Sequence, residues 1–187
     1  MEKMLEEKRR MQEEEYFRRR ERSLIERMHQ RAALESEWQR IQDAVGAGHE
    51  GVVQAMQELG YEPETVPLVY LTPLVQVAWA DDRLTARERE YIEAAARARG
   101  IEAGSAADQR LRQWFLSALG DEVFRRTLGV IRRLLATLPD EERAATRHEL
   151  LVSCSGVAAA SRGILGIGRK VSANEQVLLE AIEAELT

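Results

Sequence analysis

The N-terminal segment is dominated by charged side chains, which leaves it too little apolar surface to build a core of its own. Two adjacent aromatic residues, Tyr16 and Phe17, interrupt the charge. Aromatic side chains contribute strongly to binding when a partner's pocket buries them. The sequence therefore predicts a partner-binding arm, residues 1–45, attached to a separate body, residues 46–187.

Helical spacing predicts which arm residues share a face. In an α-helix, side chains at i, i+3, i+4 and i+7 lie together. On this spacing the aromatic pair lies with Glu13 and Arg20, and Leu24, Ile25 and Met28 extend the same side. The remaining positions carry charges of both signs, as in a solvated helix. One interpretation is that this face docks into another protein. The other is that the arm packs on its own body or forms a homodimer with a second copy.

Residues 8–28 resemble the inhibitory segment of the mitochondrial ATP synthase inhibitor protein. They share its acidic triplet, Glu13-Glu14-Glu15, and its Tyr16-Phe17-Arg18 run. The resemblance implies a helix that inserts between catalytic subunits of F1-ATPase. The long His-bearing coiled coil of the mitochondrial protein is absent, so pH control through a histidine cluster is not expected. The residues predicted to contact the partner are Glu13, Tyr16, Phe17, Arg18, Arg20, Leu24, Ile25 and Met28.

Composition predicts that the body is a single helical core. The chain has 187 residues, of which 44% are hydrophobic and only 5% aromatic, and this balance favours helices over sheets. The formal charge of −5 argues against a nucleic-acid partner. The most apolar window, residues 66–80, is short and contains Pro73, which predicts a buried helix and no membrane span.

Two features predict a cytoplasmic protein. Cys154 is the single cysteine of the sequence, so a disulfide framework is excluded and a reducing compartment is expected. The chain does not open with a basic region followed by an apolar one, so secretion is not expected.

Capping residues and helix breakers divide the body into helices. No segment alternates convincingly with the period of two that a half-buried strand requires, so the predicted fold class is all-α. Ser or Thr followed three residues later by an acidic residue marks several helix starts. The predicted helices are 50–59, a segment that starts at Thr65 and is kinked or split at Pro73, 85–100, a segment from Ser105, 121–136, 139–160 and a last segment from Ser172.

Two of these helix starts echo one another. Residues 84–88, Leu-Thr-Ala-Arg-Glu, align with residues 171–175, Val-Ser-Ala-Asn-Glu, and an apolar pair follows each. This repeat predicts a pseudo-twofold arrangement. Residues 77–89 and the glycine-rich residues 159–166 resemble the TerB-like family. The resemblance spans residues 64–186 and implies a bundle of about six to seven helices. It also implies a link to tellurite resistance and stress systems, with scaffolding or divalent-cation-binding roles.

The acidic residues of the first TerB-like segment are the candidate metal ligands: Asp81, Asp82 and Glu88. Their spacing is not that of a calcium-binding EF-hand loop. Glu88 is also the expected capping-box partner of Thr85, and Asp82 stands where the family has glycine. A well-capped surface loop is therefore the preferred interpretation, and a divalent cation is the one cofactor considered.

Catalytic chemistry finds little support in the sequence. His148 and Cys154 are six residues apart, which places them on different faces of a helix and argues against a Cys-His nucleophile pair. The predicted function is therefore non-enzymatic: inhibition of ATP hydrolysis by a bacterial F1Fo ATP synthase, carried by the arm. The alternative is a TerB-like stress-response scaffold or divalent-cation-binding module.

Overall fold

The computed structural model describes residues 50–160 and 172–186, together with seven positions of the N-terminal arm. Within these residues the protein is all-helical, with seven α-helices, one 3-10 helix and no strand. The all-α prediction is thereby confirmed. The predicted boundary between arm and body at residues 45 and 46 lies outside the described residues, as does most of the glycine-rich stretch 159–166.

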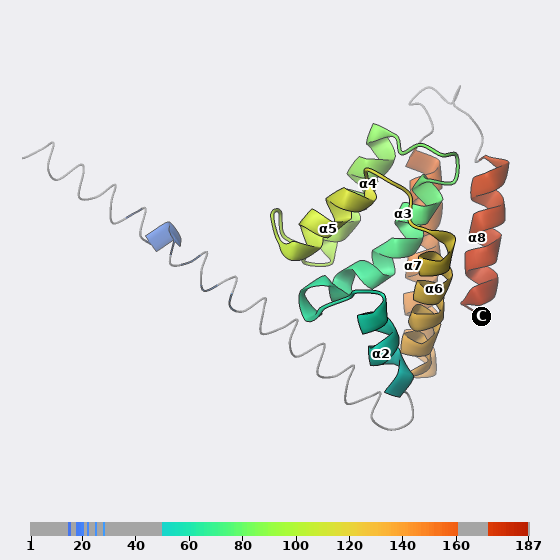
Figure 1. Cartoon of the computed structure of the whole chain (residues 1–187), viewed down its shortest axis with the longest axis horizontal. Helices are drawn as coiled ribbons and strands as arrows, with labels where there is room; N and C mark the ends of the chain where they lie inside the picture. The colour runs from blue at the N-terminus through green and yellow to red at the C-terminus, as the bar shows by residue number, and fades with distance from the viewer. Residues whose placement is uncertain are drawn as a thin grey trace, which may run out of the picture.

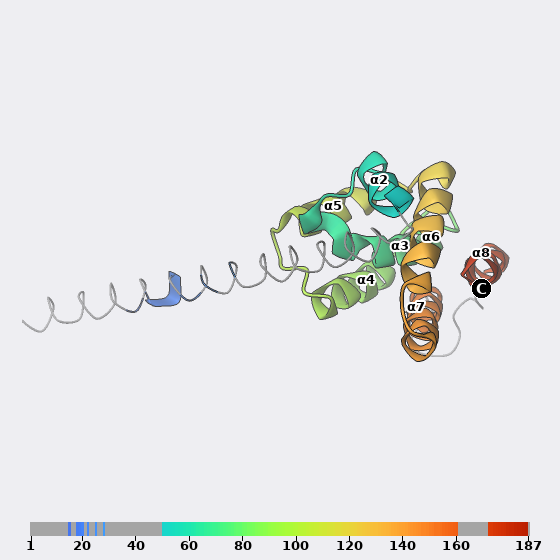
Figure 2. The same cartoon turned by 90° about the horizontal axis from the view of Figure 1, so that it is seen from below.

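The helices surround a central segment made of η1 and α3. Figure 1 shows α6, α7 and α8 running side by side, with α4 and α5 on the other side of α3. Figure 2, the view from below, shows the same division. The elements are α2 (Glu50–Glu58), the 3-10 helix η1 (Pro63–Leu71), α3 (Thr72–Ala78), α4 (Ala86–Ala98), α5 (Ala106–Trp114), α6 (Asp121–Ala136), α7 (Asp140–Ala160) and α8 (Ala173–Glu185).

The predicted capping residues begin α4, α5 and α8. At α4, the Thr85 backbone N–H donates to Glu88 Oε2 at 2.7 Å, and the Glu88 N–H donates to Thr85 Oγ1. At α8, the Ser172 N–H donates to Glu175 Oε2 at 2.6 Å, and the Glu175 N–H donates back to Ser172 Oγ. At α5, the Asp108 N–H donates to Ser105 Oγ, while the Asp108 carboxylate accepts the Gly104 N–H. These bonds satisfy backbone donors that the helix itself leaves unpaired.

The start of the second helix was predicted wrongly. Thr65 was expected to be its N-cap, but η1 begins two residues earlier, at Pro63. Proline suits a first helical position because its missing N–H would have no partner there. The Thr65 hydroxyl instead accepts a hydrogen bond from the Glu62 N–H at 2.8 Å. The predicted break near Pro73 is confirmed, because η1 gives way to α3 at Thr72.

The η1–α3 segment forms the centre of the core. Tyr61 Oη and Thr72 Oγ1 are 2.8 Å apart and buried, so this polar pair is satisfied inside the protein. The buried apolar side chains of the segment are Val66, Leu68, Val69, Leu71, Leu74, Val75, Val77 and Ala78.

None of the helices within the described residues has the length and apolarity needed to cross a membrane.

A glycine allows α4 and α7 to approach each other closely. A Cβ atom added at Gly156 would overlap Oη and Cζ of Tyr91. Real Cβ atoms do not come this near to a neighbour, so the Tyr91 ring occupies the space that a larger residue would need. Gly129 on α6 differs, because nothing lies within 4 Å of its added Cβ.

We expect Gly156→Ala to lower the free energy of unfolding by about 1–3 kcal/mol through overpacking. Gly129→Ala should raise it by up to about 1 kcal/mol, because alanine is the better helix former. Urea unfolding followed by circular dichroism measures both changes. In a Tyr91→Ala background the Gly156→Ala penalty should vanish; a penalty that persists there would show that the contact with Tyr91 is not its cause.

Candidate functional site

The described positions of the arm are helical and exposed. Ile25 is 47% exposed and Met28 64% exposed, so both side chains leave apolar surface uncovered. Four of the predicted partner-contacting residues, Glu13, Tyr16, Phe17 and Leu24, lie outside the described residues. The described positions are Glu15, Arg18, Arg19, Arg20, Arg22, Ile25 and Met28.

One ion pair stabilises the arm as a helix. Arg19 Nη2 lies 2.6 Å from Glu15 Oε1, with the glutamate one turn before the arginine. This order is the favourable one for an i, i+4 pair, and such an exposed pair contributes about 0.3–0.5 kcal/mol. The pair supports the helix that presents Ile25 and Met28.

The three candidate metal ligands are not gathered around one point. Asp81 and Asp82 are exposed, whereas the Glu88 side chain is buried and accepts the Thr85 N–H. In the part of the chain that the structure describes, no three His, Cys, Asp or Glu residues stand close enough to hold a metal ion. The capping-box role of Glu88 is observed directly.

The backbone at Asp82 has a positive φ of 59°. Only glycine adopts this left-handed conformation without strain, although Asp and Asn tolerate it better than other residues. The local backbone is therefore one that a glycine would suit.

An acidic residue that sequence reasoning treated only as a helix start is the centre of a charged network. Asp108 is buried, and its carboxylate accepts hydrogen bonds from Arg97 at 2.6 Å, Arg112 at 3.0 Å and the Gly104 N–H at 2.9 Å. Burial alone would raise the pKa of Asp108, but these three donors outweigh it and hold the pKa well below its usual range. The network joins α4 to α5.

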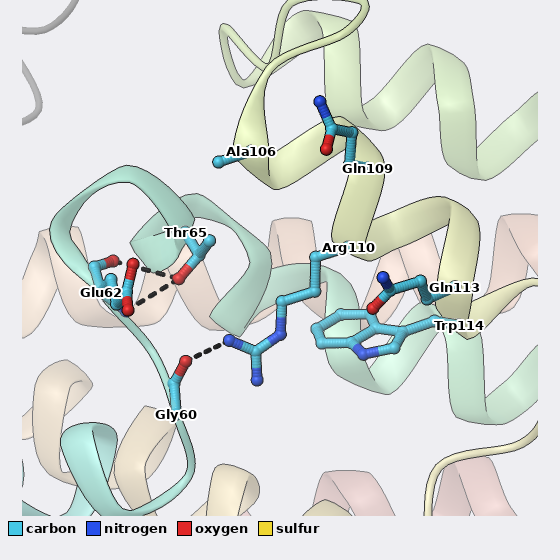
Figure 3. Close-up of a pocket in the computed structure, with 8 residues that line it drawn as sticks. All are labelled: Gly60, Glu62, Thr65, Ala106, Gln109, Arg110, Gln113 and Trp114. Carbon is cyan, nitrogen blue, oxygen red and sulfur yellow. Dashed lines mark hydrogen bonds between the residues drawn. The ribbon is translucent and has the colours of Figure 1, made fainter.

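A groove of about 590 Å³ lies beside Arg110 on α5 (Figure 3). Arg110 reaches across it to the carbonyl oxygens of Leu59 and Gly60, and its guanidinium lies 4.9 Å from the centre of the Tyr61 ring. Trp114 flanks the same guanidinium at 5.7 Å. Arg110 is thus held by hydrogen bonds and cation–π contacts, and it fastens α5 to the loop after α2.

A second groove, of about 560 Å³, runs between α7 and α8 and is called here the α7–α8 groove. Its two walls have the same spacing, i, i+3, i+4 and i+7, so each helix contributes one continuous stripe. Apolar residues form the middle, and Glu180 and Glu183 stand on one side. The lining residues are His148, Leu151, Val152 and Ser155 on α7, and Gln176, Leu179, Glu180 and Glu183 on α8.

His148 and Cys154 lie on different faces of α7, as predicted. His148 is exposed, whereas Cys154 is fully buried. Burial raises the pKa of the Cys154 thiol to about 12, so this group stays protonated and unreactive near neutral pH.

Comparison with known proteins adds no relative. No known protein family, curated protein or solved structure matches this chain. In the residues that the structure describes, the body is all-helical and the arm positions are helical and exposed.

The Asp108 network makes a prediction about stability and pH. We expect Asp108→Asn to lower the free energy of unfolding by about 2 kcal/mol at pH 7, because charge-assisted hydrogen bonds are lost from a buried site. Since the pKa of Asp108 is lowered by folding, its charge stabilises the protein above about pH 4 and this contribution fades as the pH falls. The difference between wild type and variant should therefore narrow below pH 4.

Urea unfolding at pH 7 and pH 3 measures this difference. Asp140→Asn is the control, because that carboxylate is 93% exposed and should change stability by less than about 0.5 kcal/mol. Equal effects of the two variants would contradict a special role for Asp108.

Proposed function

We propose that this protein is a non-enzymatic regulator that binds another protein through its N-terminal helical arm. The observation that carries the proposal is the exposure of Ile25 and Met28 on a helix rich in arginine. Full burial of an apolar side chain of this size is favourable by about 1.5–3 kcal/mol, and this burial has not taken place while the arm is exposed. A partner groove that covers these residues would gain that free energy.

The partner that the sequence supports best is the F1 head of a bacterial ATP synthase. The acidic triplet, the Tyr16-Phe17-Arg18 run and the later apolar residues resemble the inhibitory helix that acts there. In this mechanism the helix sits between catalytic subunits and blocks the opening and closing that ATP hydrolysis requires. Arg18 and Arg20 would contact polar groups while Ile25 and Met28 fill apolar space. The protein would act in the cytoplasm, where its single cysteine stays reduced.

The body would anchor or regulate the arm. It has a core of its own, centred on η1 and α3, to which none of the described arm positions contributes. An arm carried by an independent body can be presented or withheld as a unit.

Inhibition of ATP hydrolysis by purified bacterial F1-ATPase tests this proposal. We expect the wild-type protein to inhibit, and the Tyr16→Ala, Phe17→Ala variant to need at least about tenfold more protein for the same effect, because truncated anchors lose most binding energy. Ile25→Ala, Met28→Ala should weaken inhibition in the same direction.

Val123→Ala is the matched control, since it removes an apolar side chain exposed on the body, on α6. It should leave inhibition unchanged. Absence of inhibition at saturating protein, or equal losses for the arm and body variants, would reject the F1-ATPase assignment.

The alternative is a TerB-like scaffold or divalent-cation-binding module of a stress system, and three observations favour it. The capping boxes of α4 and α8 recur at the aligned residues. Asn174, at the start of α8, donates a hydrogen bond to the Ala80 carbonyl, so the start of α8 adjoins the loop that precedes α4. Asp82 has the backbone conformation that suits the family's glycine. The buried faces differ, however, because Ile92 is fully buried and its counterpart Leu179 is not.

The Asp82 backbone makes its own prediction. Asp82→Gly should raise the free energy of unfolding by up to about 1 kcal/mol, because glycine removes the steric cost of a positive φ. Asp81→Gly, one residue earlier and without a positive φ, should instead leave stability unchanged or lower it. Thermal unfolding followed by circular dichroism measures both. If Asp81→Gly also stabilises the protein, stabilisation by Asp82→Gly cannot be assigned to the positive φ at that residue.

A further inference from the structure

We propose that the α7–α8 groove receives the protein's own N-terminal arm, so that the arm alternates between an exposed state and a docked state. This goes beyond the proposed function, because it concerns a contact within one chain and does not depend on which partner the arm binds. The occupied groove would withhold the arm from that partner.

The groove has the shape and chemistry of a helix-docking site. Its two stripes face each other over about two helical turns, roughly 10 Å. Leu151, Val152 and Leu179 supply the apolar surface, and Val152 is 53% exposed. Glu180 and Glu183 add negative charge. A helix that docks here should present apolar side chains next to basic ones.

The acidic part of the groove lies toward one end. Figure 1 shows that α8 starts at the end of the bundle where α7 finishes, so the two helices are antiparallel. Glu183 is therefore near His148, and Gln176 is near Ser155 at the opposite end. The groove changes along its length from acidic to neutral.

The arm carries the complementary pattern on one side of its helix. Arg18, Arg22, Ile25 and Met28 follow one another at spacings of four, three and three residues, which keeps them on one face. Two basic positions come first, and two apolar positions follow. All four side chains are exposed.

The arm face and the α7–α8 groove match in the order of their charged and apolar residues and in the spacing between them. Ile25 and Met28 are one turn apart, a spacing that fits the apolar middle of the groove. Arg22 and Arg18 would then lie toward Glu180 and Glu183. Opposite charges at the rim fix the orientation of a docked helix more than they add to its affinity.

The attachment point of the arm is at the acidic end of the groove. The body begins with α2, and Gly51 lies beside Arg133 near the end of α6. The adjacent Arg132 pairs with Glu185 at the end of α8, with 2.9 Å between Nη1 and Oε1. Residues 29–49 separate the arm face from α2 and span up to about 70 Å when extended. The groove of the same chain is thus within reach.

Disulfide trapping in the full-length protein tests the docking. Ile25→Cys combined with Val152→Cys places one thiol on the arm face and one in the groove. Ile25→Cys combined with Leu116→Cys is the control, because Leu116 is 79% exposed but lies in the loop after α5, outside the groove. The native Cys154 is buried and will not compete.

Under mild oxidation, we expect the groove pair to form an intrachain disulfide at least about tenfold faster than the control pair, since docking raises the local thiol concentration. Equal rates for the two pairs would overturn the proposal. A disulfide-linked dimer without the intrachain product would also overturn it and assign the groove to a second copy.

Charge reversal tests the orientation. Glu180→Lys with Glu183→Lys should slow trapping about fivefold, and adding Arg18→Glu with Arg22→Glu should restore it. Failure of this rescue would overturn the charge pairing. Because no ATPase is present in these experiments, their outcome is separate from that of the inhibition assay.

Discussion

Most side chains of the η1–α3 segment are apolar. Other helices must therefore cover the segment from several sides. Helices α4, α6, α7 and α8 pack on α3, and α5 packs on η1. Hydrophobic burial of this kind is the main favourable term in folding. The prolines of the segment divide it into a 3-10 and an α-helical part, which lets one short stretch meet helices in different directions. The Tyr61–Thr72 hydrogen bond pairs two of the polar groups that this burial removes from water.

Buried carboxylates in this protein serve helix ends. Glu88, Asp108 and Glu175 are the buried acidic residues of the described chain, and each is the third residue of its helix. Each accepts backbone N–H groups near the start of the helix, where the dipole favours negative charge. Asp108 goes further, because Arg97 and Arg112 also hold it. The buried carboxylates of the described chain therefore set helix positions.

The surface offers two candidate binding sites, the N-terminal arm and the α7–α8 groove. Ile25 and Met28 expose apolar area that a partner can cover, and the α7–α8 groove offers apolar area bordered by acidic residues. Competition between an external partner and the groove would make the arm a switch, since a docked helix cannot bind elsewhere. The free energy that such a switch requires is a few kcal/mol, which a small apolar contact with two charge pairs can supply.

Local signals in the sequence determined the helices, because capping and helix breaking act between neighbours in the chain. The starts of α4 at Thr85 and α8 at Ser172, the end of α2 before Gly60 and the break at Pro73 were all predicted correctly. The start of η1 was missed, since Pro63 takes the first helical position and Thr65 forms a capping box with Glu62. Only the tertiary structure brought Arg97 to Asp108 and Arg110 to Gly60, and only it joined two helical stripes into the α7–α8 groove. These contacts depend on how helices pack, which no local pattern encodes.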